Sequence, residues 1–369
     1  MKSAITKTIL ISFLLVFVFS ACTHLPKPEE RIGKSGNYLD SGKHQPNARE
    51  RARHALTGKD SFEWWYFDGH LDTGETFVGV FYALSPTDGK SAVTFSLYSP
   101  DFKKSSFLQS YQNGEMKFSR EDVDINGPAG HVRRLDDRNY QVRWNMEGIV
   151  ADLKLTMAAP GWMPAGQEGI NKNSPDFFWN IHQARNHFEG TITREGQTRK
   201  VKGVGYADHN WGTRPLNEVA RHWIWGRIFA DDYTIVYADV NYINPSINSR
   251  PLYVARGDKI IVGAGSPTIR QWDFVTHPAL KRHYPRKVSI DFAEGGVETH
   301  LQIQFQALVE DVDLLTTSSL NPLSRWFLRT FIARPAYFRV IAGYKGYITE
   351  NGKVTPLEGE CLYETVEFE

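Results

Sequence analysis

The sequence predicts an all-β protein built from two antiparallel β domains in series. Runs rich in aromatic and β-branched residues, such as TFVGVFYAL and YTIVYADVNY, have the composition of strands. Turn-forming stretches such as DTGE, TDGK and GPAG separate these runs. Regularly spaced strands with few helical patterns are typical of antiparallel barrels or sandwiches. A chain of 369 residues exceeds one hydrophobic core, so we expect two domains.

The first residues are typical of an export signal. Lys2 and Lys7 precede an apolar stretch, residues 9–19, which is shorter than the about 20 residues that a membrane span needs. The stretch leads into FSAC, which resembles the lipobox of bacterial lipoproteins, where the cysteine becomes the acylated N-terminus. The alternative is an ordinary cleaved signal followed by a chance cysteine. We expect residues 1–21 to be a signal peptide and Cys22 to carry lipid.

The segment after Cys22 is polar and contains prolines and glycines, which predicts a tether over residues 22–54. Thr23 stands where an inner-membrane retention signal has Asp, so the resemblance to lipoproteins favours the outer membrane. The expected location is therefore the outer membrane, facing the periplasm, with the lipid anchor as the contact to the bilayer.

Composition excludes some partners and leaves others open. Besides Cys22 the mature chain has only Cys361, so we expect no disulfide framework, and Cys361 is interpreted as a buried small hydrophobe. Lys and Arg number 43 against 42 Asp and Glu, so no basic excess predicts a nucleic-acid partner. The 10 Trp, 16 Tyr and 22 Phe suit either a core or an apolar cavity.

The strand-like runs fall into two series. The first comprises EWWYFDGHLD, TFVGVFYAL, SAVTFSLYS, YQVRWNME and ADLKLTMAA. The second begins at HWIWGRIF and continues through YTIVYADVNY, PLYVARG, DKIIVGAG, KVSIDFAE, VETHLQIQFQALVE, YKGYITENGK and LEGECLYETVEFE. The one good helix candidate covers residues 321–335, where Asn321 can cap and Pro335 ends it. We place the boundary near residue 217, which predicts domains over 55–217 and 218–369.

The run YTIVYADVNY carries an unusual strand face. Residues two apart share a face, so one face holds Tyr233, Ile235, Tyr237, Asp239 and Asn241. If this face points inward, Asp239 lies in a low dielectric and its pKa rises, which makes it a candidate general acid. The alternative is that the face is wet and Asp239 is an ordinary exposed carboxylate.

The spacing of the remaining polar residues does not predict a metal site, a serine hydrolase or a nucleotide-binding site. His182 and His187 are five residues apart, on opposite faces of a strand, and make a poor metal pair. Asp208 and His209 are adjacent and diverge if a strand continues through them. The sequence has no G-x-S-x-G, G-x-G-x-x-G or P-loop motif. We expect no metal and no organic cofactor.

Two motifs, FEWWYFDGHL and GVGYADHNWG, resemble the lipocalin-like family that contains carotenoid 1,2-hydratase (hydroxyneurosporene synthase) and AttH-type proteins. The resemblance spans residue 55 to the end and implies two lipocalin-like β-barrels side by side, with one short helix near the C-terminus. It also implies addition of water to an isolated double bond without a cofactor. The His and Trp of DHNWG and a later Tyr-x-Asp correspond here to His209, Trp211, Tyr237 and Asp239.

The resemblance implies a role for each of these four residues. Asp239 would donate the proton to the alkene, the rings of Trp211 and Tyr237 would stabilise the cation, and His209 would hold or deprotonate water. The residues expected to bind the substrate are Trp65, Asn210, Trp225 and Tyr233. The alternative is that the motif residues pack the hinge and that Glu63, Trp64 and Trp65 pack the barrel floor.

Two functional classes follow. The first is a cofactor-independent, acid-catalysed hydratase, or a related isomerising or cyclising enzyme, acting on an apolar isoprenoid-like alkene in a barrel cavity. The second is a non-catalytic lipid-binding or carrier lipoprotein of the outer membrane. In both classes the ligand is an apolar small molecule or lipid.

Overall fold

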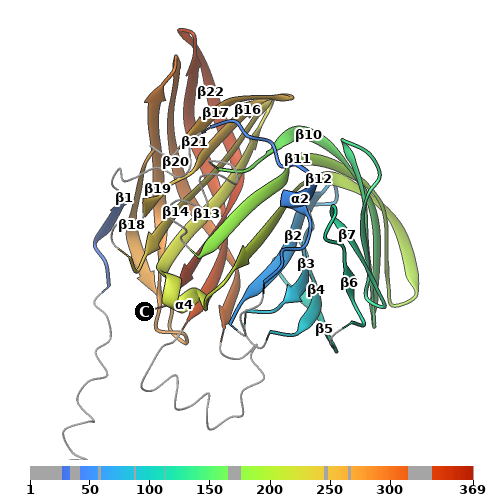
Figure 1. Ribbon diagram of the computed structural model, residues 1–369. Helices are drawn as coiled ribbons and strands as arrows, with labels where there is room; N and C mark the ends of the chain where they lie inside the picture. Colours follow the sequence, from blue (N-terminus) through green and yellow to red (C-terminus); the bar gives the residue numbers. More distant parts are fainter. Residues whose placement is uncertain are drawn as a thin grey trace, which may run out of the picture.

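In the computed structural model, two large antiparallel sheets lie side by side. The sheet built from residues 62–212, called the N-terminal sheet below, curls strongly (Figure 1). The structure describes residues 27–33, 42–56, 60–86, 89–112, 114–164, 176–244, 248–264, 267–314 and 335–368. The all-β, lipocalin-like class expected from the sequence is confirmed. Residues 1–21, Cys22 and almost all of the expected helix over 321–335 lie outside the described residues.

The N-terminal sheet pairs its strands in the order β5-β4-β3-β2-β12-β11-β10-β9-β8-β7-β6. Its strands are β2 (Phe62–Leu71), β3 (Thr76–Leu84), β4 (Ser91–Tyr98), β5 (Lys104–Tyr111), β6 (Lys117–Phe118), β7 (Asp124–Gly127), β8 (Gly130–Arg134), β9 (Asn139–Met146), β10 (Ile149–Trp162), β11 (Phe177–Arg194) and β12 (Gln197–Gly212). The DTGE turn joins β2 to β3, with Gly74 at φ 84°, a backbone conformation that glycine adopts readily.

The C-terminal sheet has the order β1-β18-β19-β20-β21-β22-β13-β14-β16-β17, with β15 paired to β14. Its strands are β1 (Glu30–Gly33), β13 (Ala220–Ala230), β14 (Tyr233–Tyr242), β15 (Asn248–Ser249), β16 (Leu252–Arg256), β17 (Lys259–Ala264), β18 (Thr268–Thr276), β19 (His283–Glu294), β20 (Val297–Asp313), β21 (Ala336–Glu350) and β22 (Lys353–Glu367). The chain passes from one sheet to the other between Gly212 and Ala220, through the short helix α4 (Leu216–Val219).

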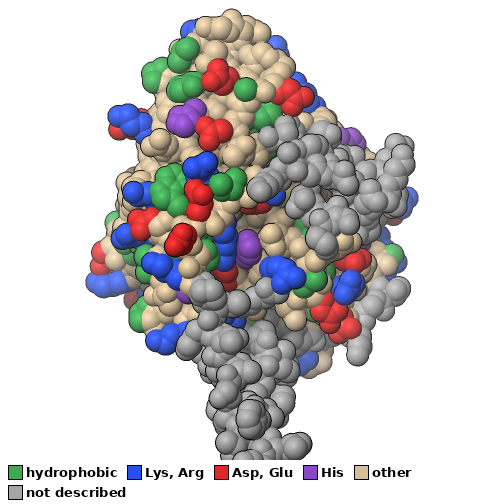
Figure 2. All heavy atoms as spheres, turned by 90° about the vertical axis from the view of Figure 1, so that its left-hand side faces the viewer, with side chains coloured by type: hydrophobic (Ala, Val, Ile, Leu, Met, Phe, Trp, Pro, Cys, Tyr) green, Lys and Arg blue, Asp and Glu red, His purple; other side chains and the backbone are tan. Residues whose placement is uncertain are grey.

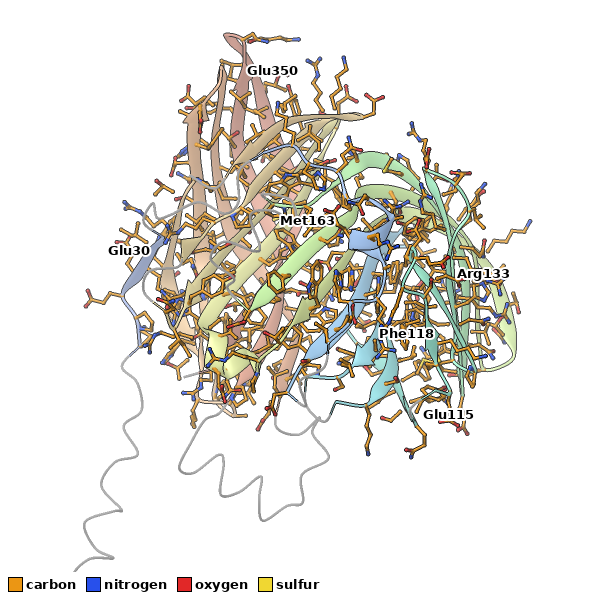
Figure 3. The ribbon with its side chains drawn as sticks, viewed as in Figure 1. Glu30, Glu115, Phe118, Arg133, Met163 and Glu350 are labelled. Carbon is orange, nitrogen blue, oxygen red and sulfur yellow. The ribbon has the colours of Figure 1, made fainter. Side chains whose placement is uncertain are left out.

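The described part of the segment expected to be a tether is packed on the fold. Glu30–Gly33 forms β1 and pairs with β18, and Figure 3 shows Glu30 at that outer edge. The helix α2 (Ala48–Arg51) is fixed by a capping box between Asn47 and Glu50. Asn180 of β11 donates its Nδ2 to the Glu50 carbonyl at 2.8 Å, so this segment is bound to the N-terminal sheet. Neither described helix is long and apolar enough to span a membrane.

Hydrophobic side chains form three large clusters. One fills the inside of the N-terminal sheet around Trp144, and a second fills the inside of the C-terminal sheet around Tyr237. The third lies between the sheets and includes Tyr206 and Trp225. On the face drawn in Figure 2, acidic and basic side chains are interspersed.

Candidate functional site

The strand β12 carries the DHNWG motif and lies at the centre of the N-terminal sheet. It pairs with β2 on one side and β11 on the other, which fixes its backbone and the direction of each side chain. Asp208 and Asn210 face the C-terminal sheet, whereas His209 and Trp211 face a second group of residues on the opposite side. The motif therefore contributes to two separate polar sites, one on each face of the same strand.

Asp208 is the centre of the site between the sheets. Its Oδ2 accepts hydrogen bonds from Trp179 Nε1 at 2.9 Å and from the Tyr206 hydroxyl at 2.9 Å, and its Oδ1 accepts one from Asn210 Nδ2 at 2.8 Å. Burial raises the pKa of Asp208 to about 8, although the hydrogen bonds from Trp179 and Tyr206 act in the opposite direction. The carboxyl group is therefore largely protonated at neutral pH.

Aromatic rings from both sheets surround this carboxyl group. Trp225 of β13 lies with its ring centroid 5.0 Å from that of Tyr206 and 6.0 Å from that of Tyr66. The indole nitrogen of Trp225 has no hydrogen-bond partner among the described residues, although it is buried. A protonated carboxyl group among aromatic faces is suited to create a carbocation and to stabilise it.

A buried network of charges joins the two sheets beside Asp208. Arg227 of β13 donates from Nε and Nη2 to Asp68 Oδ1 of β2 at 2.8 and 2.5 Å. Arg339 donates to the Tyr66 hydroxyl at 2.6 Å, and this hydroxyl also lies 3.0 Å from Glu364 Oε1. The network fixes β2 against the C-terminal sheet and brings acidic groups near Asp208.

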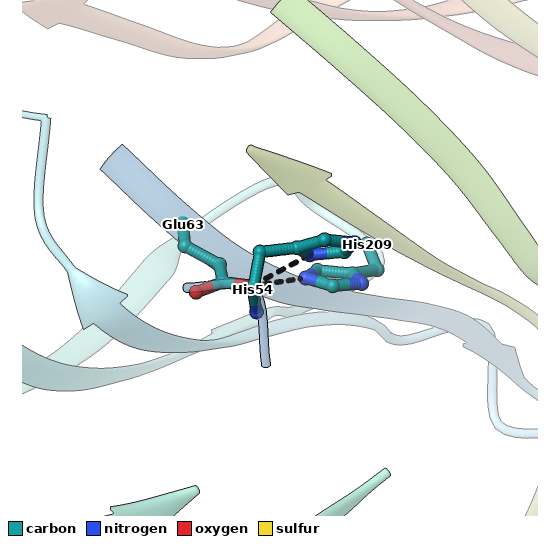
Figure 4. A group of neighbouring side chains, drawn as sticks. All are labelled: His54, Glu63 and His209. Atoms are coloured by element: carbon teal, nitrogen blue, oxygen red, sulfur yellow. Dashed lines mark hydrogen bonds and ion pairs between the residues drawn. The ribbon is translucent and has the colours of Figure 1, made fainter. Parts of the chain in front are cut away.

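The second site lies on the opposite face of β12. Glu63 Oε1 of β2 is 3.0 Å from His209 Nε2 and 3.0 Å from His54 Nδ1. Figure 4 draws these three side chains and the contacts between them. Trp65 stacks on the His209 ring at 4.1 Å, and Trp211 stacks on the His54 ring at 3.8 Å. Burial lowers the pKa of His209 to about 4 in spite of Glu63, so this imidazole is neutral at neutral pH.

Asp239 lies inside the C-terminal sheet. The alternative that its strand face is exposed to solvent is therefore excluded. The residue is buried, and burial raises the pKa of its carboxyl group against the opposing effect of Arg250, whose Nε donates to Oδ1 at 2.9 Å. Tyr237 faces the same interior, where it packs over Gly226. Among the described residues, no hydrogen bond, ion pair or ring contact joins either residue to His209 or Trp211.

The structure thus divides the four expected catalytic residues into two pairs in different sheets. The residues expected to bind substrate are divided as well. Asn210 and Trp225 lie between the sheets, and Trp65 lies beside His209. The hydroxyl of Tyr233 is 3.4 Å from Glu350, at the tip of the β21–β22 hairpin (Figure 3).

Several residues of the two sites were not anticipated from the sequence. The polar neighbourhood of His54 predicts that it belongs to the tether. No local motif singles out Asp68, Arg227 and Arg339, because they are brought together from distant strands. The position of Asp208 could have been predicted, because the alternation of side chains along a strand places it on one face with Tyr206 and Asn210.

Comparisons with known proteins place this arrangement in a family. Residues 100–319 match the family model described as AttH-like. The quinolone epoxide rearrangement protein of Penicillium thymicola is 24% identical over 237 residues, which cover 54% of this chain and 59% of that protein. The hydroxyneurosporene dehydrogenase of Chlorobaculum tepidum is 24% identical over 233 residues, covering 51% and 59%. The chain therefore spans just over half the length of these relatives.

Solved structures share the fold. A putative AttH from Nitrosomonas europaea has a TM-score of 0.60 at 16% identity and covers 88% of this chain and 97% of its own. CghA with Sch210972 has a TM-score of 0.63 at 13% identity, covering 92% and 99%. Kievitone hydratase from Nectria haematococca has a TM-score of 0.54 at 11% identity, covering 90% and 98%. Because the family model matches more than half of the residues, and the fold agrees, this chain belongs to the AttH-like family.

Proposed function

We propose that the protein is an acid-catalysed enzyme that hydrates or rearranges a small apolar alkene or epoxide held between the two sheets. The observation that carries the proposal is the buried carboxyl group of Asp208, whose pKa of about 8 keeps it protonated at neutral pH among aromatic rings. The names of two relatives, an epoxide rearrangement protein and a hydratase, describe chemistry that a proton donor of this kind can start. An isoprenoid-like alkene remains the substrate class that we favour.

The reaction balances with this single acid. For an alkene, the π electrons take the proton of Asp208 to form a C–H bond, and a cation remains on the adjacent carbon. Water attacks the cation and returns a proton to the Asp208 carboxylate. For an epoxide, the proton goes to the oxygen and the C–O bond breaks; the cation then takes up water or shifts a neighbouring group, and the product returns one proton to the Asp208 carboxylate. Trp179 and Tyr206 donate hydrogen bonds to the carboxylate that forms, and the Trp225 ring stabilises the cation.

Asp239 is less suited to this role, although the resemblance implied it. Arg250 donates to its carboxylate at 2.9 Å and Gln271 lies at 3.4 Å, and both interactions favour the ionised form. Asp239 therefore differs from Asp208, because its carboxyl group has a cationic partner, Arg250, in place of the neutral donors Trp179 and Tyr206. Asp239→Asn is therefore a matched comparison for Asp208→Asn, since both changes replace a buried strand carboxyl group by an amide.

The test uses lycopene in detergent micelles as the alkene and stilbene oxide as the epoxide. We expect the parent to add one water to an alkene, or to open the epoxide, with one deuterium fixed on carbon when the alkene reaction runs in D2O. Asp208→Asn should bind the same compound without converting it, and Asp239→Asn should convert it. If Asp208→Asn retains the parent rate, Asp208 is not the acid. Binding without conversion by the parent supports the carrier class instead.

We further propose that the enzyme is held at the outer membrane through lipid on Cys22. The support is the sequence context of this cysteine, FSAC after an apolar stretch. An anchor of this kind would place the protein beside a source of apolar substrates.

A further inference from the structure

Three side chains of metal-binding types, two His and one Glu, converge on the face of β12 that the proposed reaction does not use. His54 precedes β2, Glu63 lies on β2 and His209 lies on β12, and one ligand atom of each residue lies within 4.8 Å of the other two. Glu63 and His209 belong to the two motifs EWWYF and DHNWG, yet neither has a role in acid catalysis by Asp208. Two imidazoles and one carboxylate form a ligand set that leaves an open position on Zn²⁺ in catalytic sites.

Two of the separations between ligand atoms are close to those found around a coordinated metal ion. Zn–N and Zn–O bonds of about 2.0–2.2 Å in a tetrahedral site place neighbouring ligand atoms roughly 3.3 Å apart. Glu63 Oε1 is 3.0 Å from both His54 Nδ1 and His209 Nε2. The three ligand atoms lie within 4.8 Å of one another, so an ion could be held between them once the side chains adjust.

The hydrogen bonds of Glu63 are unevenly divided between its two oxygens. Oε1 faces three nitrogen atoms, since the His54 backbone N–H donates to it at 2.8 Å in addition to the two imidazoles. Oε2 is buried and has no hydrogen-bond partner among the described residues, and its ion-pair neighbour Arg53 keeps Nε 4.0 Å away. A fully buried carboxylate oxygen without a donor is costly in a purely structural network, whereas an ion held by both oxygens of Glu63 would use it.

The neighbouring side chains restrain the two imidazole rings and leave one side of the group accessible to solvent, where a metal ion could enter. Trp65 and Trp211 stack on His209 and His54 with interplanar angles of 11° and 12°, which restrains both rings. The side chains of Glu63 and His209 are 0% exposed, whereas that of His54 is 15% exposed. His54 therefore lies at the solvent side of the group, where an ion can enter.

We propose that His54, Glu63 and His209 form a binding site for one divalent transition-metal ion of the Zn²⁺ class. The site lies on the opposite face of β12 from Asp208 and is independent of the proposed acid catalysis. It ties the segment before β2 to the sheet, and its open position can take water or an oxygen ligand.

Titration of the untagged, chelator-treated full chain with ZnCl2 at neutral pH tests the site by calorimetry, with Co²⁺ absorption as a second readout. We expect one Zn²⁺ per chain and the visible absorption of tetrahedral Co²⁺. His54→Asn should weaken Zn²⁺ binding at least tenfold, since it removes the ligand at the solvent side. Arg53→Gln should strengthen binding, because it removes a positive charge beside the ion.

His300→Asn is the matched control, because His300 Nδ1 also faces a carboxylate, Asp291, at 2.5 Å, but lies in the other sheet outside the cluster. This variant should bind Zn²⁺ like the parent. Glu63→Gln should also weaken Zn²⁺ binding, and if this variant does not fold, His54→Asn still decides the question. Zn²⁺ binding that is absent in the parent, or that His54→Asn leaves unchanged, would overturn the proposal.

Discussion

Asp208 and His209 are neighbours in the chain, yet their side chains lie on opposite faces of β12 and belong to different sites. Asp208 contacts Trp179 and Tyr206 between the sheets, and His209 contacts Glu63 and Trp65 on the other face. Their pKa shifts have one cause, burial, and opposite directions, because burial disfavours the charged form of each group. At neutral pH both are therefore uncharged, one as an acid with a proton to give.

The pH dependence of turnover should follow Asp208. An acid with a pKa of about 8 is protonated below that value, so the rate should be level toward neutral pH and fall as pH rises through about 8. Asp208→Asn removes the transferable proton and should lower turnover by about 10²–10⁴-fold. Initial rates between pH 6 and 10 measure both effects. A rate that rises through pH 8 would identify a base in place of an acid.

Asp208 should also affect stability, with the opposite sign to an ordinary carboxylate. Its folded-state pKa of about 8 lies above the ordinary value of 3.8, so between these values the folded state binds more protons. The free energy of unfolding should therefore fall as pH rises across this window, by at most about 1.4 kcal/mol per pH unit from this group. Urea titrations of Asp208→Asn should show a flatter dependence than the parent.

Acid should destabilise the protein through its buried histidines. Burial lowers the pKa of His182 well below the ordinary value of 6.5, and its two ring nitrogens have no hydrogen-bond partner among the described residues. Below pH 6.5 the unfolded state takes up a proton that the folded state does not, so stability is lost as pH falls. His182→Leu should reduce this loss, by up to about 1.4 kcal/mol per pH unit. Urea midpoints at pH 5 and 7 measure it, with His300→Asn as the control.

The Arg227–Asp68 pair should be essential to the contact between the sheets. Arg227→Leu leaves the buried Asp68 carboxylate without its bidentate partner, and breaking a buried pair costs about 3–5 kcal/mol. Chemical denaturation should show this loss. Arg286→Leu, which breaks an exposed pair with Asp273, should change stability by less than about 1 kcal/mol.

The same contact predicts that the two sheets do not separate cleanly. A fragment that ends at Ala220 exposes Tyr66 and Asp68 without their partners Glu364 and Arg227 from the C-terminal sheet. We expect this fragment to be aggregated or loosely packed. A well-dispersed NMR spectrum from the fragment would contradict a shared interface.

The anchor prediction rests on Cys22. Cys22→Ser should leave the protein uncleaved or free in the periplasm, because the acylated residue is lost. Membrane fractionation of cells that produce each form checks this. Unchanged fractionation of the variant with outer membranes would argue against lipidation.

The alternation of residue types predicted much of the fold. The runs TFVGVFYAL and YTIVYADVNY correspond to β3 and β14 without a shift at either end. The inward direction of Asp239 followed from the same reasoning, because a strand face is a local property. The expected partners of Asp239 did not follow, since Arg250 and Gln271 come from elsewhere in the C-terminal sheet.

The sites depend on relationships that no local pattern contains. Alternation places Asp208 and His209 on opposite faces, but only the packing of the two sheets decides which face becomes the interface. The Asp68–Arg227 pair joins residues 159 positions apart. His54 lies in a polar segment whose sequence is typical of a solvated tether, and its contacts with Trp211 and Glu63 show that it belongs to the fold.

The pairing of β1 with β18 shortens the free segment that could link the folded protein to a lipid anchor at Cys22. Glu30 pairs with Trp272, so only the residues between Cys22 and Glu30 remain to separate an acylated Cys22 from the outer edge of the C-terminal sheet. Even fully extended, these residues reach about 28 Å. A lipidated form would therefore stand close to the bilayer with this edge toward it, and its orientation would be restricted rather than free.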